Sequence, residues 1–123
     1  MLKFTVSIAI GLTILMSSPA LPFDAPKYYE MKCASCHGIG TGDDVGPDLK
    51  GVTDRRTEQW LIAFIRDSEK VIKSGDPVAN EMFVKFKNKK MPAQEISDAE
   101  IKLILEFIKT GKGGEVAAYR SAL

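Results

Sequence analysis

Both cysteines and the single histidine of this 123-residue chain lie within one short run, Cys33-Ala34-Ser35-Cys36-His37. The C-x-x-C-H spacing is the attachment signature of a covalent c-type haem. On a helical turn, positions i and i+3 share a face, so both thiols can reach the vinyl groups along one haem edge. The next residue, His37, is then placed under the iron. The run therefore predicts one haem c, bound covalently through two thioethers.

The same two thiols allow other chemistry. In an exported protein, Cys33 and Cys36 could form a disulfide or a thioredoxin-like redox pair. A thioredoxin-like pair opens a helix between two strands, and no strand-like runs surround it here. A closed zinc site needs four ligands, and the chain supplies only three soft or borderline ones. Covalent haem is therefore the preferred interpretation.

The start of the chain resembles a secretory signal. Lys3 supplies the positive charge, residues 4–16 the apolar stretch, and Ser18-Pro19-Ala20 a small-residue cleavage site. An uncleaved membrane anchor is the alternative, but this stretch, interrupted by Gly11, is shorter than the roughly 20 residues that span a bilayer. We therefore expect a signal peptide over residues 1–20, no membrane span in the mature protein, and a periplasmic or otherwise exported bacterial location.

Removal of the leader would leave one small domain, residues 21–110, and a C-terminal extension, residues 111–123, for which the sequence suggests no role. The formal net charge of the whole chain is +1 at pH 7. Loss of Lys3 and addition of two haem propionates would make the mature protein slightly acidic. Such a balance identifies no partner and disfavours nucleic acid.

Apolar residues recur at helical spacing and strand-like alternation is absent, so the predicted fold class is all-α, with about four helices and connecting loops around the haem. The first helix should begin after Asp24, its N-cap, and run through Tyr28 and Tyr29 into the haem-binding segment. Glycines, Pro47 and several aspartates then predict a loop over residues 38–54.

Two middle helices carry their own start signals. Thr57 should cap a helix that presents one apolar face and ends near Asp67. Asp76 should cap the next helix, with Pro77 in its first turn.

The end of the domain has the clearest helix signal. After a loop over residues 87–96, Ser97-Asp98-Ala99-Glu100 has the pattern of a capping box. Ile96 and Ile101 are placed to close a hydrophobic staple across it. The helix should stop at Gly111.

The chain holds no second histidine, so the ligand opposite His37 must be a methionine, a lysine, water or nothing. Met1 and Met16 would leave with the leader, and Met31 lies too close to the attachment segment to reach the opposite haem face. Met82 lies on an expected helix at core spacing, where methionine commonly fills gaps. Met91 lies in a loop beside Pro92, which can fix the backbone while the thioether points inward. Met82 and Met91 remain, and the loop position favours Met91.

Over roughly residues 25–110, the chain resembles a class I monohaem cytochrome c of the small soluble bacterial kind. In that family a C-x-x-C-H helix is followed by a Gly-Pro loop, one or two middle helices, a Met-Pro loop and a closing helix. The matching segments here are residues 33–37, Gly46-Pro47-Asp48-Leu49, residues 57–65, Lys90-Met91-Pro92 and the helix after Ser97.

The resemblance implies a role for each residue at a matching position. Cys33 and Cys36 would form the thioethers, and the iron would be bound by His37 and Met91 from opposite faces. The Pro47 carbonyl would accept the free ring N–H of His37, a bond that fixes the orientation of the imidazole.

Two aromatic residues are also given roles by the resemblance. Trp60 would either donate its indole N–H to a haem propionate or simply pack. Tyr29 would pack near Ile104 and Phe107, where the first and last helices of the family cross.

Haem iron held by His and Met is coordinatively full, so the resemblance implies a one-electron carrier rather than an enzyme. Redox protein partners are expected. Four lysines near Met91 could form a positive surface that docks an acidic partner, and an ordinary solvated lysine face is the alternative. They are Lys85, Lys87, Lys89 and Lys90.

Two other functions would use the same motif. The protein could be a dedicated electron-entry subunit that stays bound to one redox enzyme. It could also be a haem sensor or peroxidase with an open iron site, which requires that Met91 be absent from the iron. The leading interpretation is a diffusible electron carrier.

Overall fold

The elements that surround the predicted haem motif are all helices. A computed structural model describes residues 22–110, and helix is the regular secondary structure found in that part of the chain. The helices are α1 Ala25–Lys32, α2 Val52–Arg55, α3 Glu58–Arg66, α4 Ser68–Lys73, α5 Pro77–Lys85 and α6 Asp98–Thr110. The all-α prediction is confirmed. The predicted signal peptide and C-terminal extension lie outside the described residues, as does the predicted stop at Gly111.

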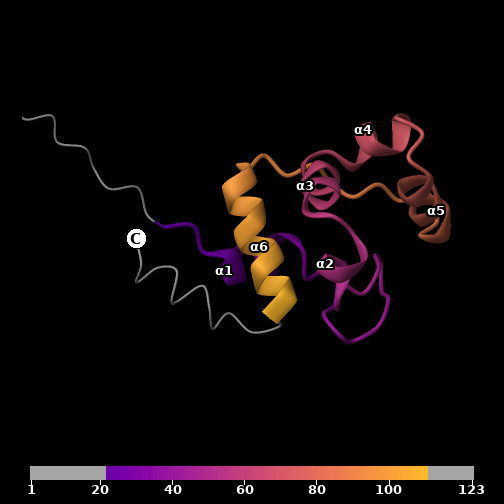
Figure 1. Cartoon of the computed structure of the whole chain (residues 1–123). Helices are drawn as coiled ribbons and strands as arrows, with labels where there is room; N and C mark the ends of the chain where they lie inside the picture. Colours follow the sequence, from indigo (N-terminus) through magenta and orange to yellow (C-terminus); the bar gives the residue numbers. More distant parts are fainter. Residues whose placement is uncertain (1–21, 111–123) are drawn as a thin grey trace, which may run out of the picture.

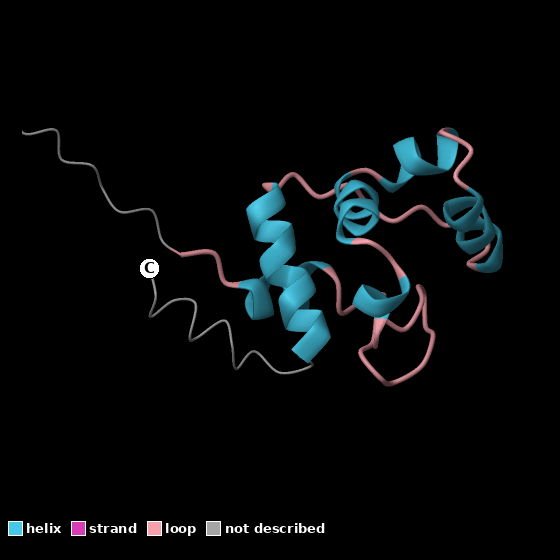
Figure 2. Ribbon diagram, in the orientation of Figure 1, coloured by secondary structure: helices cyan, strands magenta, loops and turns pink. Residues whose placement is uncertain are grey.

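The first and last helices lie together, and the other helices extend away from them. Figure 1 shows α6 lying across α1, with α3 beside them and α5 farthest away. Long irregular segments join α1 to α2 and α5 to α6 (Figure 2). None of the helices in the described part of the chain is both long and apolar enough to cross a membrane.

Each of the four predicted helix starts is found at its capping residue. The side chains of Asp24, Thr57 and Asp76 each accept a hydrogen bond from the backbone N–H three residues on, at 3.1, 3.2 and 2.8 Å. The capping box is also present: Ser97 N–H donates to the Glu100 carboxylate at 2.8 Å, and Glu100 N–H donates to the Ser97 hydroxyl at 3.2 Å. These side chains satisfy N–H groups that have no partner within their helix.

Two short helices were not predicted. The four residues of α2 lie inside the segment predicted as a loop and begin after Gly51, whose φ is 70°. Helix α4 follows α3 at once, because Asp67 both ends α3 and caps α4 by accepting from Lys70 N–H at 3.0 Å. Elements this short contain too few turns to show a helical repeat of apolar residues.

The predicted extension of the first helix into the haem-binding segment is wrong, because the helix stops one residue before Cys33. Helix α1 ends at Lys32, and Ala34 N–H reaches back five residues to the Tyr29 carbonyl at 2.9 Å, which breaks the regular ladder. The motif then forms its own turn, in which Cys36 and His37 N–H both donate to the Cys33 carbonyl at 3.0 Å. The i, i+3 relation of the two cysteines is therefore kept by a separate turn.

The buried core lies where α1 crosses α6. Tyr29 is packed with Ile101, Ile104, Leu105 and Ile108 of α6 and with Leu61 of α3. The rings of Tyr29 and Phe107 are tilted, with centroids 5.3 Å apart. The predicted packing of Tyr29 against the last helix is confirmed. This crossing anchors the end of α1 from which the haem motif projects.

Candidate functional site

A cavity of ≈330 Å³ lies between the turn after α1, the following loop, α3, α5 and the segment around Met91. That volume is within the range of about 300–1,000 Å³ found for organic ligands. Its walls are largely apolar and include Leu49, Leu61, Phe64, Val78, Phe83 and Phe86. Such walls suit a flat, mostly apolar group rather than a sugar or a nucleotide phosphate.

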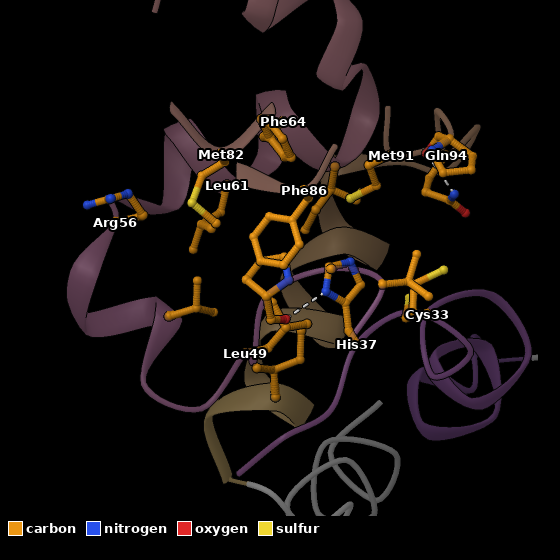
Figure 3. Close-up of a pocket in the computed structure, with 18 of the residues that line it drawn as sticks. Cys33, His37, Leu49, Arg56, Leu61, Phe64, Met82, Phe86, Met91 and Gln94 are labelled. Atoms are coloured by element: carbon orange, nitrogen blue, oxygen red, sulfur yellow. Dashed lines mark hydrogen bonds between the residues drawn. The ribbon is translucent and has the colours of Figure 1, made fainter. Parts of the chain in front are cut away.

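The cavity brings together side chains that are far apart in the sequence. Each residue predicted to contact the cofactor lines it: Cys33, Cys36, His37, Pro47, Trp60 and Met91. They come from the motif turn, the loop after it, α3 and the segment between α5 and α6 (Figure 3).

His37 is held by its ring and by its backbone. Its Nδ1 lies 2.9 Å from the Pro47 carbonyl oxygen, the dashed line at the centre of Figure 3. A carbonyl can only accept, so Nδ1 carries a proton, and the neutral ring in this tautomer has its lone pair on Nε2. The Tyr29 hydroxyl donates to the His37 carbonyl at 2.9 Å, which ties the residue to the α1–α6 core. His37 is therefore oriented as a nitrogen ligand.

Gly46 lies directly against the imidazole. A Cβ at this position would be 2.5 Å from His37 Cε1 and 2.9 Å from Nδ1. Gly46 N–H donates to the Cys36 carbonyl at 2.8 Å, which fixes the glycine beside the motif turn. The sequence marks Gly46 only as part of a Gly-Pro pair, whereas the structure shows that the ring needs a residue without a side chain there.

The loop that carries Gly46 and Pro47 is organised by Asp48. Its carboxylate accepts from the backbone N–H groups of Gly40 and Lys50 at 2.9 and 2.8 Å, and also from that of Gly42. These backbone hydrogen bonds lower the pKa of Asp48 to about 2. Asp43 accepts from Asp48 N–H at 2.9 Å. The loop is thus closed by its own aspartates.

The two cysteines are free thiols at the wall of the cavity. Burial, and then the neighbouring Cys36, raise the pKa of Cys33 to about 11, so Cys33 is a neutral S–H at neutral pH. A free S–H is the reactant from which a thioether to a vinyl group forms. In residues 22–110, no group of three or more His, Cys, Asp or Glu side chains is placed to hold a metal, so the zinc alternative has no support there.

Two methionines line the cavity and a third does not face it. Met31 is 65% exposed on α1. Met82 and Met91 are both wall residues. In Figure 3, His37 and Met91 approach the same space from opposite sides, while Met82 lies beside Leu61 and Arg56. Both methionines therefore remain candidates for the second iron ligand, and Met91 is the one that faces the imidazole in this view.

The segment around Met91 is tied to helices at both ends of the cavity. The Ser68 hydroxyl, at the start of α4, donates to the Met91 carbonyl at 2.7 Å. The Gln94 side chain donates to the Pro92 carbonyl at 3.0 Å and accepts from the Tyr28 hydroxyl at 2.6 Å. Neither tie was predicted, because nothing in the sequence around Ser68 or Tyr28 points to a partner so far along the chain.

Trp60 joins α3 to α5. Its indole N–H donates to the Asp76 carboxylate at 3.2 Å, and its ring stacks on Phe64 with centroids 4.9 Å apart. Of the two predicted roles, packing describes this arrangement, and the propionate contact stays a prediction. Arg55 and Arg56, which the sequence analysis missed, also line the cavity, and the Arg56 guanidinium lies 5.8 Å from the Trp60 ring centroid.

Two of the four predicted docking lysines are engaged in ion pairs. Lys85 lies 2.9 Å from Asp43, which joins the end of α5 to the loop beside His37. Lys90 lies 2.9 Å from Glu69, which also pairs with Lys73 at 2.7 Å. Hydrogen bonds from Lys73 and then Lys90 lower the pKa of Glu69 to about 2. Pairing leaves less net positive charge around Met91 than the sequence alone suggests.

The residues at the cavity fit a covalent haem. The donor set is two thiols, one imidazole with a free Nε2 and one thioether, and the walls are apolar. Gly46 supplies the space that the ring of His37 requires. Soft sulfur and imidazole ligands suit iron in a haem.

Comparisons with known proteins identify the family and the fold. The sequence model of the family "Cytochrome c" matches residues 24–112. The cytochrome c domain of the pp3183 protein from Pseudomonas putida is similar, with 26% identity over 76% of this chain and 89% of that one and a TM-score of 0.59. A cytochrome c from Rhodothermus marinus has 20% identity over 75% of this chain and 82% of that one, with a TM-score of 0.62, and shares the fold. No curated protein matches the chain.

Proposed function

The chain belongs to the cytochrome c family, as a small class I member, and from this premise we propose that it carries single electrons on one haem c attached through Cys33 and Cys36. The observation that supports this most strongly is that both thiols, His37 and Met91 line one apolar cavity. The bound haem would supply a one-electron redox change. The chain would hold the iron and exclude water.

We propose that His37 and Met91 would bind the iron of the haem. The bond from Nδ1–H to the Pro47 carbonyl, 2.9 Å long, directs the lone pair of Nε2 away from the loop and raises its basicity. A thioether is a soft ligand that favours reduced iron. Apolar walls add to this preference, because burial penalises the extra positive charge of oxidised iron. The chain therefore favours a higher reduction potential than paired histidines would give.

The cations at the edge of the cavity suit the acidic groups of a haem. We propose that Arg55 and Arg56 offset the charge of the propionates, since both line the cavity. With its N–H already donated to Asp76, Trp60 would serve chiefly to hold α3 against α5.

Replacement of Met91 by alanine tests the ligand set. The purified ferric wild-type protein should show a methionine-to-iron charge-transfer band, and Met91→Ala should lose it completely, because alanine carries no donor atom. Ferrous Met91→Ala should also bind carbon monoxide rapidly, whereas the wild-type protein should not. Optical spectra and stopped-flow mixing measure both effects.

The matched control is Met82→Leu, which keeps the volume of a wall residue and removes its sulfur. It should retain the band. Loss of the band on changing Met82 would exchange the roles of the two methionines. Rapid carbon monoxide binding by the wild-type protein would favour the sensor or peroxidase alternative.

We propose that the surface around Met91 docks a redox partner through Lys87 and Lys89, which make no ion pair with another residue in the described part of the chain. Electron transfer to an acidic redox protein should slow by about tenfold or more as ionic strength rises from 10 mM to 150 mM, because salt screens the attraction. Stopped-flow rates measure this.

The variant Lys87→Gln/Lys89→Gln should lower the rate at low salt and flatten the salt dependence. Lys109→Gln, in the last turn of α6, is the control and should change neither. A rate that is independent of ionic strength in the wild-type protein would exclude electrostatic docking. Export directed by residues 1–20 remains a proposal from the sequence.

A further inference from the structure

One polar side chain is buried in the described part of the chain. Ser68, the first residue of α4, is 1% exposed. Its hydroxyl does not cap α4, because the side chain of Asp67 accepts from Lys70 N–H there. The hydroxyl instead donates to the carbonyl of Met91, 23 residues further along the chain, at 2.7 Å.

This bond acts on the irregular segment that carries Met91. Residues 89–97 between α5 and α6 have no regular secondary structure. Farther along this segment, Gln94 N–H donates to the Arg66 carbonyl at 3.3 Å, and the Arg66 guanidinium donates to the Ile96 carbonyl at 3.4 Å. The Ser68 bond is shorter and is made to the carbonyl of the proposed ligand residue itself. It therefore fixes the point from which the Met91 side chain starts.

Removal of a buried donor leaves its acceptor without a partner, which costs more than the hydrogen bond itself contributes. Without the Ser68 hydroxyl, the Met91 carbonyl would regain a partner only by turning toward water, which moves Met91 away from the cavity. With the hydroxyl present, the hydrogen bond favours the position in which the Met91 sulfur faces His37.

We propose that Ser68 is a positioning residue that sets how readily the Met91 sulfur leaves the iron. This rests on the proposed function, in which Met91 is an axial ligand. Ser68 touches neither the iron nor the haem in this role. It acts through the backbone of Met91.

The experiment measures the affinity of the ferric holoprotein for added imidazole, which can bind only where the sulfur has left. Ser68→Ala should raise this affinity by about tenfold and weaken the methionine-to-iron band. Ser74→Ala is the matched control: Ser74 directly follows the last residue of α4, and its exposed hydroxyl donates to the Val71 carbonyl at 2.6 Å. It should change the affinity by less than about twofold. Ser68→Thr, which keeps a hydroxyl, should stay near wild type and gives a second folded variant.

A double-mutant cycle with Met91→Ala distinguishes an effect of Ser68 on the Met91 sulfur from a general loss of rigidity around the haem. In a chain without the sulfur there is nothing for imidazole to displace, so Ser68→Ala should then have no effect on imidazole affinity. An effect of equal size in that background would overturn the inference. So would an unchanged affinity in Ser68→Ala when the wild-type protein shows the band. If the wild-type protein lacks the band, the proposed ligand set itself is wrong.

Discussion

Replacement of both Cys33 and Cys36 by serine is expected to remove all covalent haem. A hydroxyl does not add to a vinyl group under the conditions in which a thiol does, so no link can form. Haem stain on a denaturing gel should fall from full intensity to zero. Ser35→Ala, a change between the two cysteines at a residue whose hydroxyl lies 3.8 Å from Cys36 Sγ, should retain the stain.

The same double variant should also lose much of its stability. The cavity of ≈330 Å³ would lack its covalently held contents. Loss of the apolar contacts between the cavity walls and these contents should remove much of the free energy of unfolding, which is only about 5–15 kcal/mol for a whole domain. Circular dichroism should show a largely unfolded chain. A well-folded double variant that still stains for haem after denaturation would contradict the covalent attachment through these thiols.

The second large effect is expected from Gly46→Ala. The added Cβ would lie 2.5 Å from His37 Cε1, a separation that forces the ring or the loop to move. Moving the ring lengthens its hydrogen bond to Pro47, so both the fold and the orientation of the imidazole should suffer. We expect a loss of about 3 kcal/mol in the free energy of unfolding, measured with denaturant, and an altered haem spectrum.

Gly75→Ala is the control for this prediction. Gly75 has a φ of 83° and no heavy atom within 4 Å of an added Cβ. Its replacement should cost only backbone strain, about 1–2 kcal/mol, and leave the spectrum unchanged. A Gly46→Ala protein with the wild-type spectrum and stability would show that the ring does not depend on this contact.

The sequence predicted four of the five helices whose first turn is capped by a side chain. Each cap is a hydrogen bond between a side chain and the backbone N–H three residues on, so both partners are visible in a short stretch of sequence. The capping residues are Asp24, Thr57, Asp76 and Ser97. Helix α4 escaped prediction because Asp67 serves two helices at once, and the sequence suggests only its role as an end.

The residues that line the cavity were predicted from the motif and the family resemblance, but only one of the contacts that hold them in place was predicted. The Pro47 carbonyl lies where the resemblance implies. Ser68 could not be predicted in this way, because a serine after an aspartate is typical of an ordinary helix start. The contact that distinguishes it is with a carbonyl 23 residues away in the sequence. The contact of Gly46 with the ring likewise depends on atoms that only the folded loop brings together.

The supports of His37 lie close to it in the sequence, at 8 residues for Tyr29 and 10 for Pro47. Met91 depends on Ser68, at 23 residues, and on the chain between them being folded. Closing a longer loop costs more conformational entropy. We therefore expect the contacts around Met91 to open before those around His37. If Met91 binds the iron as proposed, we expect gentle denaturation to release its sulfur before the nitrogen of His37, and this first stage of unfolding should change the absorption spectrum.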